Sequence, residues 1–145
     1  EKERNILRYR PASTQVRGCA DAKLVDVARV VAAGLLAAGD NISVCLDPSL
    51  GEGLGRALRS VGVAVTTASD EDWYASLGAS RVRLVGGNPS RAADEADGDP
   101  DLALWANEVT SAPQVELLPF LREQSVSMTA HRFGNPDAGV LSVRL

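Results

Sequence analysis

Short apolar runs alternate with helix-like stretches along most of the chain. Apolar residues recur at helical spacing from Asp21, a suitable N-cap, to Ala38, and Gly39 ends this predicted helix. Further helices are predicted over residues 51–60, 70–77, 90–96 and 113–123, the last interrupted by Pro119. Runs of β-forming residues predict buried strands over residues 42–46, 63–67, 81–85 and 102–105. This alternation favours an α/β fold with a mainly parallel sheet that helices cover on both faces.

The pattern changes near the C-terminal end. Between Ser125 and His131 apolar and polar residues alternate, which is typical of a strand with one exposed side. Turn residues fill 134–139, and Val140–Leu145 is a second apolar strand-like run. We therefore expect a C-terminal β-hairpin or arm over residues 125–145, and an unpaired apolar edge there needs a cover. Residues 1–12 are interpreted as a linker or lead strand from an upstream domain, and 13–124 as the α/β domain.

Composition excludes several classes of function. The 145 residues carry 15 basic and 19 acidic side chains, so a nucleic-acid partner is not expected. Cys19, Cys45 and the single His131 match neither a zinc site nor a disulfide framework. No apolar run approaches the ~20 residues of a membrane span. We expect one soluble domain, and since the first residue is Glu1, a piece of a longer polypeptide.

Candidate catalytic groups are few. Cys19 and Cys45 lie in apolar runs and are expected to be buried and reduced, and His131 has no acidic residue near it in sequence. The acidic residues within 94–101 lack the spacing of a calcium loop, which indicates a solvated loop. Arg81 and Arg83 alternate with apolar residues and suggest an edge strand or the entrance of a strand, more than an anion site. From the motifs we predict no catalytic, cofactor-binding or metal-binding residue in this chain.

One glycine cluster supports an alternative. Gly51, Gly53 and Gly55 follow a predicted strand and open a predicted helix, as in a dinucleotide-binding loop. Arg56 stands where the third glycine of that motif belongs, and Asp47 and Glu52 would repel a phosphate. A loosely wound surface helix is the simpler interpretation, with a nucleotide-binding module as the alternative.

The two ends of the chain resemble a known family. The opening Glu1-Lys2-Glu3-Arg4-Asn5-Ile6-Leu7-Arg8-Tyr9-Arg10-Pro11 resembles the segment that leaves the aldehyde dehydrogenase domain of proline utilisation A, where a Gly-Glu-x-Asn run leads to a proline. The closing stretch from Leu117 to Asn135 resembles that family's terminal arm, whose core Arg-Glu-x-Ser-Val-Ser-x-Thr-Ala is found at 122–130. After Ala130 this chain has His131-Arg132-Phe133 where the family has small residues.

The resemblance implies a Rossmann-like three-layer domain without catalytic residues of its own. The parent enzymes are bifunctional: an FAD-dependent proline dehydrogenase passes its product through a channel to an NAD-dependent glutamate-semialdehyde dehydrogenase. The arm of this domain would cover the aldehyde dehydrogenase domain of the same polypeptide and support channelling, or contact a symmetry mate in the isolated chain. The expected partner-contact residues are Ser127, Thr129, His131, Arg132, Phe133 and Asn135.

The remaining expectations concern cofactors, location and assembly. The chain itself would hold no cofactor, because FAD and NAD belong to the parent's catalytic domains. The expected location is the cytoplasm, with the inner-membrane periphery as an alternative reached through the parent enzyme. A plain dimerisation domain that associates through its tail is a further alternative.

Overall fold

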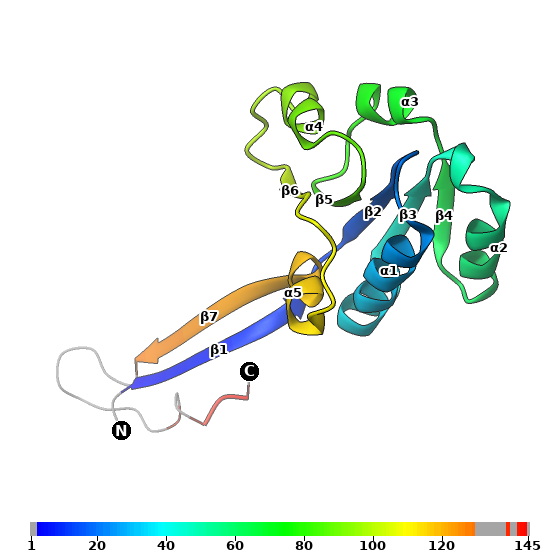
Figure 1. The fold of residues 1–145 in the computed structure, drawn as a ribbon. Coiled ribbons are helices and arrows are strands. Elements are labelled where there is room, and N and C mark those ends of the chain that lie inside the picture. Colours follow the sequence, from blue (N-terminus) through cyan, green and yellow to red (C-terminus); the bar gives the residue numbers. More distant parts are fainter. Residues whose placement is uncertain (1–2, 130–138, 140–141, 145) are drawn as a thin grey trace. The chain divides into compact units, whose positions relative to one another are not determined.

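The computed structural model describes residues 3–129, 139 and 142–144 (Figure 1). Contacts divide the chain into two compact units. One unit is Pro11–Leu121, and the other combines Glu1–Arg10 with Arg122–Leu145. Each unit is described by itself below.

The larger unit is built on a parallel sheet in the order β4-β3-β2-β5-β6. Its strands are β2 (Thr14–Gly18), β3 (Ile42–Leu46), β4 (Ala64–Thr67), β5 (Arg81–Val85) and β6 (Ala103–Trp105). In chain order this is the 3-2-1-4-5 arrangement of doubly wound nucleotide-binding folds. The central strand β2 pairs with β3 through Val16 and Val44, and with β5 through Val16 and Arg83. The Rossmann-like α/β fold is therefore confirmed.

Helices cover both faces of this sheet (Figure 1). The α-helices are α1 (Leu24–Ala38), α2 (Glu52–Ser60), α3 (Asp70–Ala75), α4 (Pro89–Glu95) and α5 (Pro113–Leu117). Short 3₁₀ turns are η1 (Gly39–Asn41), η2 (Pro48–Leu50) and η3 (Leu118–Phe120). One hydrophobic cluster joins α1, α2 and η3 to the sheet, including Val30, Leu58 and Phe120. The other joins α3 and α4 to the opposite face, including Trp73 and Ala92.

Four of the five sheet strands match the predicted runs, and Ser69 caps α3 by accepting a hydrogen bond from the Asp72 amide. The central strand β2 was not predicted. The first helix begins at Leu24, not at Asp21, and its N-cap residue makes no side-chain cap. The last helix is also shorter than predicted, because η3 follows Leu117 and residues from Leu121 onward form a strand.

The second unit contains a two-stranded ribbon of β1 (Glu3–Pro11) and β7 (Leu121–Thr129). Side-chain hydrogen bonds join Arg8 to Gln124 and Tyr9 to Glu123. Because these partners step in opposite directions along the two strands, the strands are antiparallel. The prediction allowed a C-terminal hairpin or an arm; among the described residues, β7 pairs with the N-terminal strand β1. The described residues 142–144 of the predicted last strand are a turn and irregular backbone, and the rest of 140–145 lies outside the described residues.

No helix in the described part of the chain is both long and apolar enough to cross a membrane.

Candidate functional site

The carboxyl edge of a doubly wound sheet is where ligands usually bind, at the point where successive helices go to opposite faces. Here that point lies between β2 and β5, and it contains a crevice of about 390 Å³. The crevice lies beside the loops that follow β2, β5 and β6. Its charged lining residues are Asp21, Lys23, Asp26 and Glu108. Three carboxylates against one ammonium make this crevice unfavourable for a phosphate group.

The Asp21 carboxylate binds a backbone amide that lines this crevice. Its Oδ1 accepts a hydrogen bond of 2.6 Å from the Gly87 amide, which would otherwise be available to an anion. Gly86 and Gly87 both have positive φ angles of 72° and 73°. A Cβ on Gly86 would collide with Asp21 Oδ1, and one on Gly87 would lie 2.5 Å from the Cys19 sulfur. The hydrogen bond between Asp21 and the Gly87 amide explains why Asp21 does not cap α1. It also joins the loop after β5 to the loop after β2.

The glycine cluster follows β3, the second strand of the fold, whereas a dinucleotide loop follows the first. Gly51 has a φ of 77° and precedes α2, while a Cβ on Gly53 would face open space. Gly55 is buried, and a Cβ there would make only ordinary contacts, 3.5 Å from Arg59 and 3.7 Å from Leu46 and Val65. The packing of α2 on the sheet therefore does not require a glycine at this position. Whether a nucleotide binds here stays a prediction of the alternative hypothesis.

Asp47 faces the neighbouring loop and uses both carboxylate oxygens. Oδ1 accepts from the amide and hydroxyl of Ser49 at 2.9 and 2.6 Å, and Oδ2 accepts from the Asp70 amide at 3.0 Å. Burial alone would raise the pKa of Asp47, but the hydrogen bonds from Ser49 and Asp70 and the charge of Arg17 lower it overall. A carboxylate held in its charged form therefore takes the amide of Ser49, which lies two residues before the glycine cluster, and the amide of Asp70.

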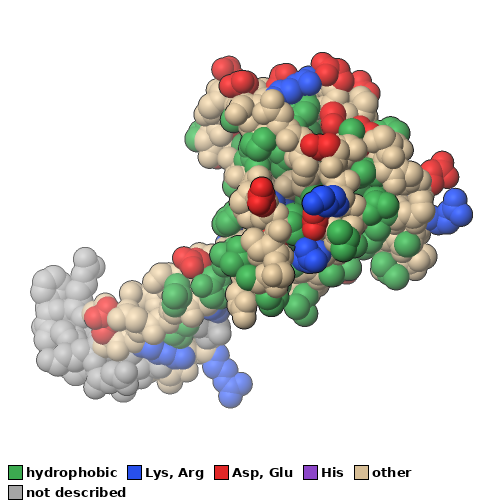
Figure 2. Space-filling model, in the orientation of Figure 1, with side chains coloured by type: hydrophobic (Ala, Val, Ile, Leu, Met, Phe, Trp, Pro, Cys, Tyr) green, Lys and Arg blue, Asp and Glu red, His purple; other side chains and the backbone are tan. Residues whose placement is uncertain are grey.

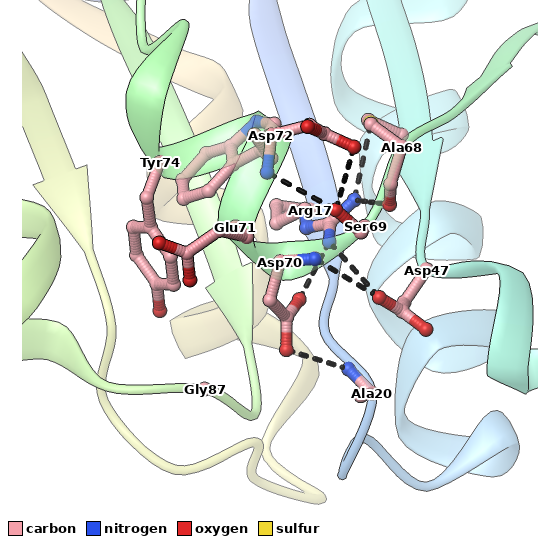
Figure 3. A network of polar contacts seen from close by, with 12 residues as sticks. Arg17, Ala20, Asp47, Ala68, Ser69, Asp70, Glu71, Asp72, Tyr74 and Gly87 are labelled. Carbon is pink, nitrogen blue, oxygen red and sulfur yellow. Dashed lines mark hydrogen bonds and ion pairs between the residues drawn. The ribbon is translucent and has the colours of Figure 1, made fainter.

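Sequence reasoning missed the most buried charge at this edge, Arg17 on β2 (Figure 3). Its side chain is 0% exposed, and its Nη2 donates to Asp70 Oδ1 at 2.5 Å. Nη1 donates to the Ala68 carbonyl at 3.0 Å and to the Cys45 sulfur at 3.2 Å. Asp70 in turn accepts from the Ala20 amide at 3.1 Å. The network ties together the loops after β2, β3 and β4.

The protonation states of this network argue against nucleophilic chemistry. Burial, followed by the nearby charge of Asp70, raises the pKa of Cys19 to about 12, so the thiol stays neutral. Burial alone would lower the pKa of Arg17, but its hydrogen bond to Asp70 raises it. Trp73 covers the guanidinium, with its ring centroid 5.4 Å away. Cys19 and Cys45 are both buried free thiols, as predicted.

Arg83 forms a second buried ion pair. Of the two interpretations of Arg81 and Arg83, the edge strand was wrong, because β5 lies between β2 and β6, whereas Arg81 does stand at the entrance of β5. Arg83 is 0% exposed and its Nη2 lies 3.0 Å from Glu116 Oε2 of α5. It also donates to the carbonyls of Trp105 and Asn107. This ion pair attaches α5 to the sheet, and its two charges neutralise each other within the fold.

The β1–β7 ribbon contains the described part of the predicted contact residues. Ser127 and Thr129 are exposed on β7, and Ser127 Oγ donates to Asn5 Oδ1 at 2.5 Å. Val126 and Met128 are half-buried, so the predicted alternation is confirmed as far as Thr129. Leu7 and Tyr9 of β1 are 66% and 51% exposed. The other predicted contact residues, His131, Arg132, Phe133 and Asn135, lie outside the described residues.

Among the described residues, no group of three or more His, Cys, Asp or Glu side chains is arranged to hold a metal ion. The acidic residues after α4 include Asp97, which has a φ of 46°, and Asp99, whose carboxylate accepts from the Asp101 amide. These are features of a solvated turn.

No protein-family model matches the chain, and no curated protein matches it. Among solved structures, the chain is similar to Proline Utilization A (PutA) from Corynebacterium freiburgense. The similarity has a TM-score of 0.44 and 24% sequence identity, and it covers 92% of this chain. The chain spans 11% of the length of that protein. PutA carries the name of the family that the two end segments resemble.

Proposed function

We propose that this chain is a non-catalytic C-terminal domain of a bifunctional proline-catabolising enzyme. In this proposal the β1–β7 ribbon lies on the aldehyde dehydrogenase domain of the same polypeptide and supports substrate channelling. FAD and NAD are cofactors of the parent's catalytic domains, and the enzyme works in the cytoplasm.

One observation carries the proposal. The two segments that resemble proline utilisation A lie at opposite ends of the sequence, yet they supply the two strands of one ribbon. The opening segment becomes β1, and the segment that begins at Leu117 supplies β7. Segments related to the same interface are expected to fold together, and here they pair strand against strand.

The ribbon has the physical properties of a docking element. A two-stranded ribbon is marginally stable in water, and within residues 3–129 each of its strands has one edge without a hydrogen-bonding neighbour strand. Leu7 and Tyr9 add exposed apolar surface to it. Pairing of an edge with a strand of a neighbouring domain would satisfy backbone groups and bury these side chains.

The charged groups at the carboxyl edge support a non-catalytic role. Arg17, Asp47 and Asp70 are bonded to one another or to backbone, and Arg83 and Glu116 form a closed pair. Cys19 is held as a neutral thiol. An enzyme needs such groups directed toward a substrate, whereas here they hold loops together.

The test uses the parent enzyme with proline as substrate. Deleting the residues after Glu123 removes most of β7, and we expect slower aldehyde oxidation and a longer lag before coupled product appears. The proline-oxidising step, assayed alone with an artificial electron acceptor, should be unchanged. Equal coupled turnover and an equal lag in both enzymes would contradict the proposal.

A point variant guards against a deletion that only disturbs folding. Leu7→Glu places a charge on the exposed side of β1, and Val61→Glu is the matched control because Val61 is 67% exposed on the other unit. We expect Leu7→Glu to lengthen the lag and Val61→Glu to leave it unchanged. Equal effects of the two variants on the lag would show that the exposed side of the ribbon is not responsible for it.

A further inference from the structure

Helix α1 is apolar around almost its whole circumference. Among its 15 residues, Asp26 and Arg29 are the charged ones, and the remainder are Leu, Val, Ala and Gly. The inner side packs on the sheet through buried residues such as Val27 and Val31. A surface helix normally has a polar outer side, and a helix that is apolar on all sides is normally covered on all sides. The outer side of α1 therefore has the composition of a covered surface.

All but Val61 of the large exposed hydrophobic side chains described in the Pro11–Leu121 unit lie on α1 or on the segment packed beside it. They are Leu24, Val25, Leu35 and Leu36 of α1, at 48%, 61%, 36% and 78% exposed, and Val115 and Leu118 at 41% and 40% from the segment packed beside α1. We name these six residues the α1 face. Figure 2 shows hydrophobic side chains collected over α1 and α5. Concentrated apolar surface of this kind marks an interaction site.

Along the exposed side of α1, side chains of similar size stand at equal distances in sequence on either side of Val30. Leu24 and Leu36 are equally far from Val30, and so are the exposed Ala28 and Ala32. Large side chains thus stand at both ends and small ones in the middle. When two such helices lie antiparallel, Leu24 of each faces Leu36 of the other, and the two alanines face each other. Self-complementarity of this kind is the requirement for a two-fold symmetric contact.

We propose that the α1 face binds the α1 face of a second copy of this chain, with the two helices antiparallel and the two-fold axis at the level of Val30. The small side chains Ala28 and Ala32 allow the helix backbones to approach closely at the axis, and the leucines close the contact at both ends.

Charges at the ends of α1 complement this arrangement. Lys23 precedes the helix and Asp40 follows it, and both are exposed. Within the part of the chain that the structure describes, neither takes part in an ion pair. In the antiparallel pair, Lys23 of each copy lies at the end of the partner helix where Asp40 is found. Near the axis, Arg29 is neutralised by Asp26 at 3.0 Å, so two like charges do not meet there.

The size of the contact sets its strength. A helix of 15 residues is about 22 Å long, and one helix pair buries less than the ~800 Å² per partner of a standard stable complex. Val115 and Leu118 extend the contact on one side. We expect a weak dimer that forms at micromolar or higher concentration. This contact does not involve the β1–β7 ribbon, so it can fail without affecting the proposed function.

The first experiment measures sedimentation velocity of the 145-residue chain over a concentration series. Leu36→Arg should raise the dimer dissociation constant by about tenfold or more, because a leucine that the contact buries is lost. Val61→Arg is the matched control, since Val61 is 67% exposed outside the α1 face. Circular dichroism melts check that both variants are folded. A monomer at every concentration, or a dimer that Leu36→Arg leaves intact, would overturn the proposal.

The second experiment tests the antiparallel direction through the end charges. Lys23→Glu and Asp40→Lys should each weaken the dimer, because each places like charges at both ends of the contact. The double variant exchanges the charges and should restore dimerisation close to the original level. A double variant as weak as the single ones would exclude the antiparallel pairing.

Discussion

The guanidinium of Arg17 and the carboxylate of Asp70 lie 2.5 Å apart although the residues are separated by 53 positions in the sequence. The Arg17 side chain is 0% exposed, whereas that of Asp70 is 29% exposed. Because of this difference in exposure, we expect removal of Asp70 and removal of Arg17 to change the free energy of unfolding by different amounts.

Asp70→Asn should destabilise the fold by about 3 kcal/mol, because it leaves the buried Arg17 charge with too little compensation. Arg17→Met should cost less, since water can reach the partly exposed Asp70 that remains. Chemical denaturation gives the free energy of unfolding for both variants. Glu52→Gln is the control: Glu52 is 92% exposed and its ion pair with Arg56 is on the surface, so we expect a change below about 0.5 kcal/mol. A larger loss for Arg17→Met than for Asp70→Asn would contradict this account.

Local sequence patterns predicted the elements well and the long-range polar contacts poorly. The runs that became β3 and β5 are bounded by turn residues and read directly as strands. The central strand β2 is short, contains Arg17, and follows an arginine-rich segment, so its local pattern is polar. Arg17 is accommodated there by Asp70, which the sequence places far away.

Two other differences have the same physical origin. Asp21 has the sequence position of a helix cap, but its carboxylate binds the Gly87 amide of a distant loop. Arg83 has the pattern of an exposed strand residue, but Glu116 neutralises it inside the fold. In each case a tertiary contact replaces the local interaction that the pattern predicted. The pairing of β7 is also a long-range contact, because its neighbour β1 lies at the other end of the chain.

The second prediction concerns pH. The pKa of Asp47 is lower in the folded state than its ordinary value of 3.8. Its contribution to stability is therefore full well above pH 3.8 and is lost as the pH falls through the folded pKa. Unfolding free energies measured at decreasing pH should fall more steeply in this range for the wild type than for Asp47→Asn.

Glu71 is the control for this measurement. The hydrogen bond and charge of Arg91 lower the pKa of Glu71, but this group lies on the surface. High salt should weaken its effect, while the contribution of Asp47 should persist because Asp47 itself is 7% exposed. Parallel acid profiles for the wild type and Asp47→Asn would show that the Asp47 contacts do not stabilise the fold.

The third prediction concerns the attachment of α5. Glu116→Gln retains the shape of the side chain but removes the charge beside Arg83, whose side chain is 0% exposed. We expect a loss of about 3–5 kcal/mol, the usual cost of leaving a buried charge without its partner. Hydrogen exchange should show faster opening of α5 than of β2 or β3.

A double variant separates charge from packing at this position. Arg83→Met with Glu116→Leu removes both charges and keeps apolar volume, so it should recover part of the stability lost in Glu116→Gln. Recovery should be incomplete, because the carbonyls of Trp105 and Asn107 lose the donor that Arg83 supplies. A double variant that is less stable than Glu116→Gln would show that the pair contributes more than neutralisation.

The fourth prediction tests the nucleotide-binding alternative directly. Calorimetric titration of the chain with NAD should give no binding at micromolar concentration. A pyrophosphate needs free backbone amides at the carboxyl edge of the sheet. Here the Asp47 carboxylate takes the amides of Ser49 and Asp70, and Asp21 takes the Gly87 amide. The carboxylates also repel the ligand, so binding would require these contacts to break and the loops to separate.

Gly53→Val makes this test specific. A Cβ at Gly53 has no atom within 4 Å, so a side chain there begins in open space and adds bulk where a nucleotide would contact the glycine cluster. Binding by the wild type that Gly53→Val abolishes would establish the alternative and contradict a purely structural role for this edge. Binding that Gly53→Val leaves unchanged would direct attention to the crevice between β2 and β5. There Asp21→Asn, by removing the charge opposite the Gly87 amide, should then increase affinity for the phosphate groups.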